Sequence, residues 1–228
     1  MPRLFDARRV EAHSTPMPSD AYEQFQKSTI MDHEKWHDGI GYDLDAFKQM
    51  SADEQTQVVD QIRRKSEKDW RDAELLEFVG ADPKHANDAD KTLREMADSE
   101  LIDLPAQLRA IEALIDAGKL DDVDRRLAAA LGQAESFNGL DAALSLAGEH
   151  PGPLVKIALV QGVRDRPGEV GVNYAAMLYF LAGITKEEFD WDMRPFFLHF
   201  ADDTPKAEHD AAFAELCQRL QVDPKSIP

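Results

Sequence analysis

The sequence has few cysteines and no apolar stretch long enough to span a membrane. Its 228 residues include one cysteine, Cys217, so no internal disulfide is possible. The longest apolar run, residues 174–182, is much shorter than the roughly 20 residues that a transmembrane helix needs. The first residues, MPRLFDARRVEAH, carry charges where a secretory signal has an apolar core. Together these absences predict a cytoplasmic protein.

Basic residues are also scarce relative to acidic ones. The chain has 26 lysines and arginines against 44 aspartates and glutamates, which gives a net charge of −18. A surface of this sign repels phosphate backbones, so we do not expect nucleic acid to be a partner. Two interpretations stay open: the acidic surface serves only solubility, or it attracts a basic protein and speeds its encounter.

Alternation of apolar and polar residues, the sign of a half-buried strand, is missing throughout the chain. The chain instead shows helix start and stop signals. Ser51 and Glu54 have the spacing of a capping box, and Asp82-Pro83 and Asp103-Leu-Pro105 are typical helix starts. We expect further helices over residues 70–79, 121–131, 139–147, 154–163 and 168–182 and after Pro205, with glycines at positions 80, 118, 132, 148 and 183 as stops.

The expected helices are short and closely spaced, which favours antiparallel hairpins. Residues 104–131 and 140–163 form two such hairpins of similar length with Leu/Ala-rich faces. The sequence therefore predicts an all-α fold, an irregular α-solenoid of HEAT-like antiparallel hairpins. Residues 1–35 are expected to form a partly irregular arm, with a short helix over residues 20–27, and residues 36–228 a single helical-repeat domain.

The densest group of large side chains follows an apolar helix near the C-terminus. Residues 189–200 read FDWDMRPFFLHF, and carboxylates lie on both sides of them. We expect the rings of Phe189, Trp191, Phe196, Phe197 and Phe200 to form a structural aromatic cluster that joins the last helix to the rest. The candidate partner-binding residues are the flanking acids Glu187, Glu188, Asp190, Asp192, Asp202 and Asp203. The alternative is that the rings themselves face a partner, because interfaces use Trp, Phe and Arg.

Candidate catalytic and metal-binding motifs are few. His33, Glu34 and His37 spell HExxH, which on a helix can hold zinc with the glutamate as base. Gly39 and Gly41 end any such helix at once, so a metal-dependent hydrolase is the alternative rather than the prediction. Asp190 and Asp192 match a three-letter D-x-D pattern without a phosphate-binding glycine loop. Cys217 lies on the apolar face of the last expected helix, where it belongs to the core. We therefore expect no catalytic residue, no metal and no cofactor.

Two stretches resemble a group of bacterial HEAT-like helical proteins found beside polymorphic and type VI secretion toxins. They are WHDGIGYDL at residues 36–44, and the helix over residues 170–181 with the following FDWDMRPFFLHF and the helix over residues 213–217. The likeness covers residues 36–224, and its most specific part is Arg194-Pro-Phe-Phe. The resemblance implies an immunity or adaptor role and supplies no catalytic residues.

Charge, layout and resemblance together predict an immunity protein. It would bind and neutralise a cognate secreted toxin, a basic nuclease effector, by protein–protein contact. A general helical-repeat scaffold with other partners is the second alternative. We expect no membrane contact. The sequence names neither the toxin nor the binding face nor the oligomeric state.

Overall fold

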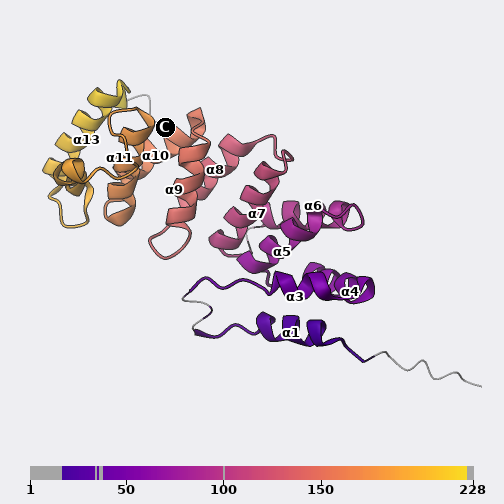
Figure 1. Cartoon of the computed structure of the whole chain (residues 1–228). Coiled ribbons are helices and arrows are strands. Elements are labelled where there is room, and N and C mark those ends of the chain that lie inside the picture. The colour runs from indigo at the N-terminus through magenta and orange to yellow at the C-terminus, as the bar shows by residue number, and fades with distance from the viewer. Residues whose placement is uncertain (1–16, 34, 36–37, 100, 225–228) are drawn as a thin grey trace, which may run out of the picture. The chain divides into compact units, whose positions relative to one another are not determined.

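A computed structural model of the chain describes residues 17–224 apart from residues 34, 36, 37 and 100. These described residues contain helices, turns and one isolated pair of β-bridges at Glu135, and no β-strand. The predicted all-α helical-repeat fold is confirmed. The contacts divide the chain into two compact units, Met1–Gln61 and Ile62–Pro228 (Figure 1), whereas the sequence suggested a boundary at residues 35/36.

The first unit contains α1 (Asp20–Thr29), α3 (Leu44–Gln49) and most of α4 (Ala52–Arg64). Phe25 of α1 is buried against the rings of Tyr42 and Phe47, at 5.5 and 5.8 Å between ring centroids. The predicted capping box is present, because Glu54 accepts hydrogen bonds from Ser51 N and Oγ at 2.9 and 2.8 Å. Glu54 also accepts from Ser19 N and Oγ, at 2.8 and 3.1 Å, and so joins the start of α4 to the start of α1.

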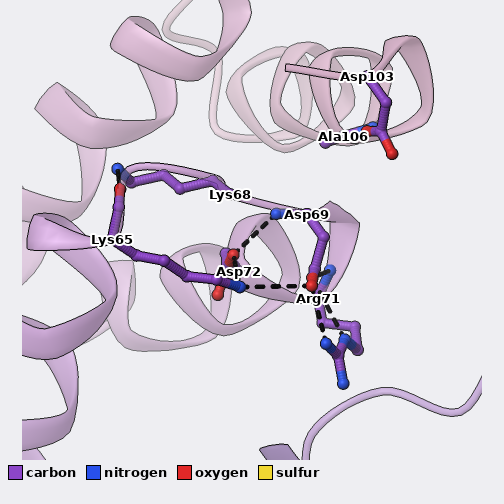
Figure 2. A network of polar contacts seen from close by, with 7 residues as sticks. All are labelled: Lys65, Lys68, Asp69, Arg71, Asp72, Asp103 and Ala106. Carbon is purple, nitrogen blue, oxygen red and sulfur yellow. Dashed lines mark hydrogen bonds and ion pairs between the residues drawn. The ribbon is translucent and has the colours of Figure 1, made fainter. Parts of the chain in front are cut away.

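The second unit begins with three helices that all pack on one another. They are α5 (Trp70–Gly80), α6 (Ala86–Ala97) and α7 (Leu104–Asp116). A buried polar network fixes the start of α5 (Figure 2). The fully buried Asp72 accepts from Lys65 Nζ at 2.7 Å and from Asp69 N at 2.8 Å, while Asp69 binds the Arg71 guanidinium. Burial alone would raise the pKa of Asp69, but the Arg71 hydrogen bonds and the Lys65 charge outweigh it and lower that pKa.

The helices that follow alternate between two rows. They are α8 (Val123–Gln133), α9 (Leu140–Glu149), α10 (Pro153–Asp165) and α11 (Glu169–Leu181). One row contains α7, α9 and α11, each touching the next, and the other contains α8 and α10 (Figure 1). This stacking is the arrangement of an α-solenoid. The chain then forms η1 (Trp191–Met193), α12 (Arg194–Phe197), η2 (Leu198–Phe200) and α13 (Lys206–Leu220).

Helix pairing differs from the prediction in one place. Residues 140–163 were expected to form a hairpin, but α10 packs mainly on α8 and α11 rather than on α9. Asp124 of α8 supplies one reason, because its carboxylate accepts from Leu154 N and Val155 N at 3.0 and 2.9 Å and caps α10. Gly162 supplies another, since its missing side chain lets the Tyr174 ring of α11 lie against α10.

Several helix ends also differ from the prediction. Gly80, Gly132 and Gly148 lie inside the last turns of their helices, and none has a positive φ. Gly118 and Gly183 do adopt φ of 64° and 69° just beyond α7 and α11, as a terminating glycine should. Asp82-Pro83 does not start α6 directly. These two residues form a turn whose Asp82 carbonyl accepts from His85 N and Ala86 N, both at 2.9 Å, and α6 begins at Ala86.

Candidate protein-binding surface

The segment after α11 turns back and runs along that helix. The Phe197 ring meets Tyr179, in the last turns of α11, edge-on at 5.3 Å between centroids. Three residues later, the Phe200 carbonyl accepts a hydrogen bond of 2.7 Å from Gly168 N, just before α11 begins. Gly171 makes the close approach possible, because a Cβ there would lie 3.2 Å from the Phe200 carbonyl oxygen. Residues 197–200 therefore contact α11 near both of its ends.

The predicted aromatic cluster exists, but its members differ in burial. Phe197 and Phe200 are fully buried, and Phe189 and Phe196 are half-buried. Phe189 packs on Phe197 at 5.7 Å and meets Trp191 edge-on at 5.5 Å. Trp191 departs from the expectation of a buried cluster, since 72% of its surface is exposed. It contacts the cluster through Phe189, and the Arg194 guanidinium lies over its ring, 5.7 Å from the centroid.

The cluster contacts α13 through Arg219 and His209, which no sequence pattern singles out. The Arg219 guanidinium lies 4.7 Å from the centroid of the Phe196 ring and is paired with Glu215. His209 packs edge-on against Phe200 at 5.5 Å, and its Nε2 lies 3.1 Å from the Val163 carbonyl oxygen. Cation–π contacts of this kind leave no periodic trace in a sequence, so the helical pattern predicts only that Phe213, Leu216, Cys217 and Leu220 of α13 face inward. The first three are buried and Leu220 is half-buried. Burial raises the pKa of the Cys217 thiol.

Four of the six candidate acids lie near the C-terminal end of α11. Glu187, Glu188 and Asp192 are exposed and Asp190 is half-exposed. Asp190 caps the η1 turn by accepting from Asp192 N at 2.9 Å. Glu188 reaches toward α9, where a Cβ on Gly148 would lie 3.3 Å from its Oε1. The carboxylates thus gather near the C-terminal ends of α9 and α11.

The other two candidates lie at the opposite end of α11. Asp202 and Asp203 are exposed, and the Asp202 carboxylate sits over Gly168, where a Cβ would come within 2.5 Å of its Oδ1. Gly168 has φ of 107° and precedes the first residue of α11. With 13 residues, α11 is about 20 Å long, so the six candidates do not form one patch. The sequence predicted their exposure but not their separation.

The exposed residues at the C-terminal end of α11 form what we call the Trp191 surface: Ile184, Glu187, Glu188, Trp191 and Asp192. Ile184 is 44% exposed and adds apolar area. Lys186 and Arg194 are the nearby cations in the sequence, and the Arg194 guanidinium lies 5.7 Å from the centroid of the Trp191 ring. The arrangement offers a large amphipathic ring beside carboxylates, which suits a protein partner better than a reaction.

The HExxH motif lies largely outside the described residues, since these include His33 but neither Glu34 nor His37. His33 is exposed. Within the described part of the chain, no three His, Cys, Asp or Glu side chains come together as a metal site would require. In the same residues, no helix combines the length and the apolar character needed to cross a membrane.

The chain matches no family model, no curated protein and no solved structure.

Proposed function

We propose that this chain is an immunity protein that binds and neutralises a cognate secreted toxin, a basic nuclease effector. The observation that carries the proposal is the exposed Trp191 ring, which packs against the half-buried Phe189 and is flanked by carboxylates in the sequence. A tryptophan side chain that is free to rotate loses conformational entropy when it binds a partner. In this chain the Phe189 ring and the Arg194 guanidinium over the Trp191 ring already restrict its rotation, which lowers the entropic cost of association.

The charges supply the second part of the proposal. A net charge of −18 attracts a basic protein over a distance set by the Debye length, about 8 Å at physiological salt. Glu187, Glu188 and Asp192 then provide the local carboxylates that meet lysines and arginines of a nuclease, in place of its nucleic-acid phosphates. Steering of this kind raises the association rate, while burial of the Trp191 ring in the complex slows dissociation. Covering the toxin's basic site is the mechanism that we infer.

The test is binding of the purified chain to the product of the neighbouring gene, with rescue of cells that express that product. We expect Trp191→Ala to weaken binding by about 2 kcal/mol or more, as loss of a central anchor does. Ile30→Ala is the matched control, because Ile30 is 65% exposed and lies in the other unit. No complex and no rescue with the unaltered chain would sink the proposal, and partners from other genes would favour a general scaffold.

Charge needs a separate control. The pair Glu187→Lys/Glu188→Lys should reduce the association rate and its salt dependence. The pair Glu23→Lys/Asp53→Lys changes the net charge equally on exposed residues of the first unit. If both pairs slow association equally, net charge alone attracts the partner and the Trp191 surface has no part in the encounter.

A further inference from the structure

Two neighbouring loops of the second unit each hold one large apolar side chain out in solvent. Leu101, between α6 and α7, is 96% exposed, and Phe137, between α8 and α9, is 102% exposed. Folding has therefore removed none of the Phe137 ring from water. Single exposed apolar residues are common on protein surfaces. Here the loops before α7 and before α9 each expose one, so the same feature occurs twice in the second unit.

The Phe137 loop is a built turn. Glu135 N donates to the Asn138 carbonyl at 3.1 Å, and Asn138 N donates to the Glu135 carbonyl at 2.8 Å. Gly139 then adopts φ of 77°, which lets α9 begin at once. Below the turn, the Arg166 guanidinium donates to the carbonyl of the buried Ala134. The ring is thus presented on a fixed backbone, and a partner would not have to order it.

The helices that follow the two loops begin side by side. A Cβ on Gly139 would lie 3.1 Å from the Leu104 and Leu108 side chains of α7, so the starts of α7 and α9 touch. Packed helices have axes about 8–10 Å apart. Residues i and i+7 of an α-helix are about 10 Å apart, because each residue rises about 1.5 Å. A helix lying across the two loops can therefore place one apolar residue on Leu101 and another, two turns away, on Phe137.

The charges near these two loops indicate which sign of charge a partner should carry. Asp103, Glu135 and Asp141 are exposed there. The neighbouring cations are engaged within the chain: Arg126 pairs with Asp98 and Asp122, and Arg166 binds the carbonyls of Leu131, Gly132 and Ala134. The edge thus combines apolar tips with exposed carboxylates, of which that of Asp103 also caps α7 by accepting from Ala106 N at 3.0 Å.

We propose that the loop-tip edge, formed by Leu101, Asp103, Glu135, Phe137 and Asp141, docks a basic amphipathic helix of a protein partner. The helix places apolar side chains at i and i+7 on Leu101 and Phe137, and its flanking lysines and arginines meet the carboxylates. This edge lies at the N-terminal end of α9, whereas the Trp191 surface lies near the C-terminal end, by Gly148. The two surfaces are separate, so the proposal does not depend on the toxin.

The test uses a synthetic amphipathic peptide of leucine and lysine at helical spacing, about 14 residues long. It is titrated into the isotopically labelled full chain and followed by NMR. We expect amide shifts to centre on residues 101–103 and 135–141. Phe137→Ser should weaken binding by about tenfold to a hundredfold, because burial of a phenylalanine ring is lost. Ile30→Ser, also exposed, should leave binding unchanged.

A second peptide of the same composition, shuffled so that the apolar period is lost, separates recognition from charge attraction. Weaker binding of the shuffled peptide is the expected result. Equal binding of the two peptides, unchanged binding to Phe137→Ser, or shifts centred on the Trp191 surface would each overturn the proposal. Far-UV circular dichroism checks that Phe137→Ser folds, which its full exposure leads us to expect.

Discussion

Replacing Gly162 by alanine tests the packing of α10 on α11 against local helix preference. Both Gly162 and Gly132 lie inside helices without a positive φ, so helix propensity alone predicts that alanine stabilises each. The gain would be up to about 1 kcal/mol at each site. Tertiary packing predicts opposite results at the two positions. Nothing lies within 4 Å of a Cβ on Gly132, whereas a Cβ on Gly162 would lie 2.5 Å from Tyr174 Cε2.

The magnitude follows from what the Tyr174 ring would have to do. Carbon atoms in contact normally lie about 3.5–4.0 Å apart, so the ring must shift by more than about 1 Å. Tyr174 is 1% exposed, and its hydroxyl donates to the Leu131 carbonyl at 2.5 Å. Overpacking costs about 1–3 kcal/mol and a strained or broken hydrogen bond about 1 more. After subtraction of the propensity gain, we expect Gly162→Ala to destabilise the chain by about 1–3 kcal/mol.

Urea unfolding followed by circular dichroism measures the effect, with Gly132→Ala as the matched control. Gly132→Ala should be neutral or slightly stabilising. In a Tyr174→Leu background the penalty of Gly162→Ala should largely disappear, because the ring that causes it is gone. A Gly162→Ala protein as stable as the unaltered chain would refute the reasoning, as would an undiminished penalty in the Tyr174→Leu background.

Two further predictions concern titrating groups. Burial raises the pKa of Tyr174 to about 12 from its usual 10.0, although Arg166 acts in the opposite direction. Because the folded state holds this proton more tightly, the stability contribution is complete below pH 10 and is lost as the pH rises through about 12; Tyr174→Phe should flatten that dependence in urea titrations at alkaline pH. Backbone and side-chain hydrogen bonds from Ser19 and Ser51 lower the pKa of Glu54 to about 2 from 4.5. Its contribution is therefore complete above pH 4.5 and is lost as the pH falls toward 2, and Glu54→Gln should speed hydrogen exchange at the Ser19 and Ser51 amides at neutral pH. An unchanged exchange rate would show that these bonds add little.

Local signals account for most of what the sequence predicts correctly. The Ser51/Glu54 capping box and the start at Asp103-Leu-Pro105 depend on residues a few positions apart, so they are legible without the fold. Gly118 and Gly183 likewise end helices through their own backbone conformation.

Long-range contacts account for most of what the sequence does not predict. Gly148 was expected to end its helix, yet it lies inside α9 and faces Glu188 and Met177. Gly162 lies inside α10, where the Tyr174 ring of α11 packs against it, and no local pattern predicted that contact. Asp124 caps a helix that begins about 30 residues later, and Arg166 binds the end of α8 from across the unit. No periodicity marks such pairs. The pairing of α10 with α8 and α11 could not be predicted for this reason.

The course of residues 191–200 along α11 decides how the acidic residues can act. A flexible loop would leave Glu187 and Asp202 free to approach one basic site together. Instead Phe197 is held at Tyr179 and Phe200 at Gly168, so the carboxylates before and after the segment are fixed near opposite ends of a helix about 20 Å long. Asp202 lies over Gly168, where the α10–α11 loop ends, and Arg166 at the start of that loop donates to the Ala134 carbonyl, just before the turn that carries Phe137. The carboxylates of the Trp191 surface and those on the side of Phe137 therefore lie on different parts of the second unit, each with its own exposed aromatic ring.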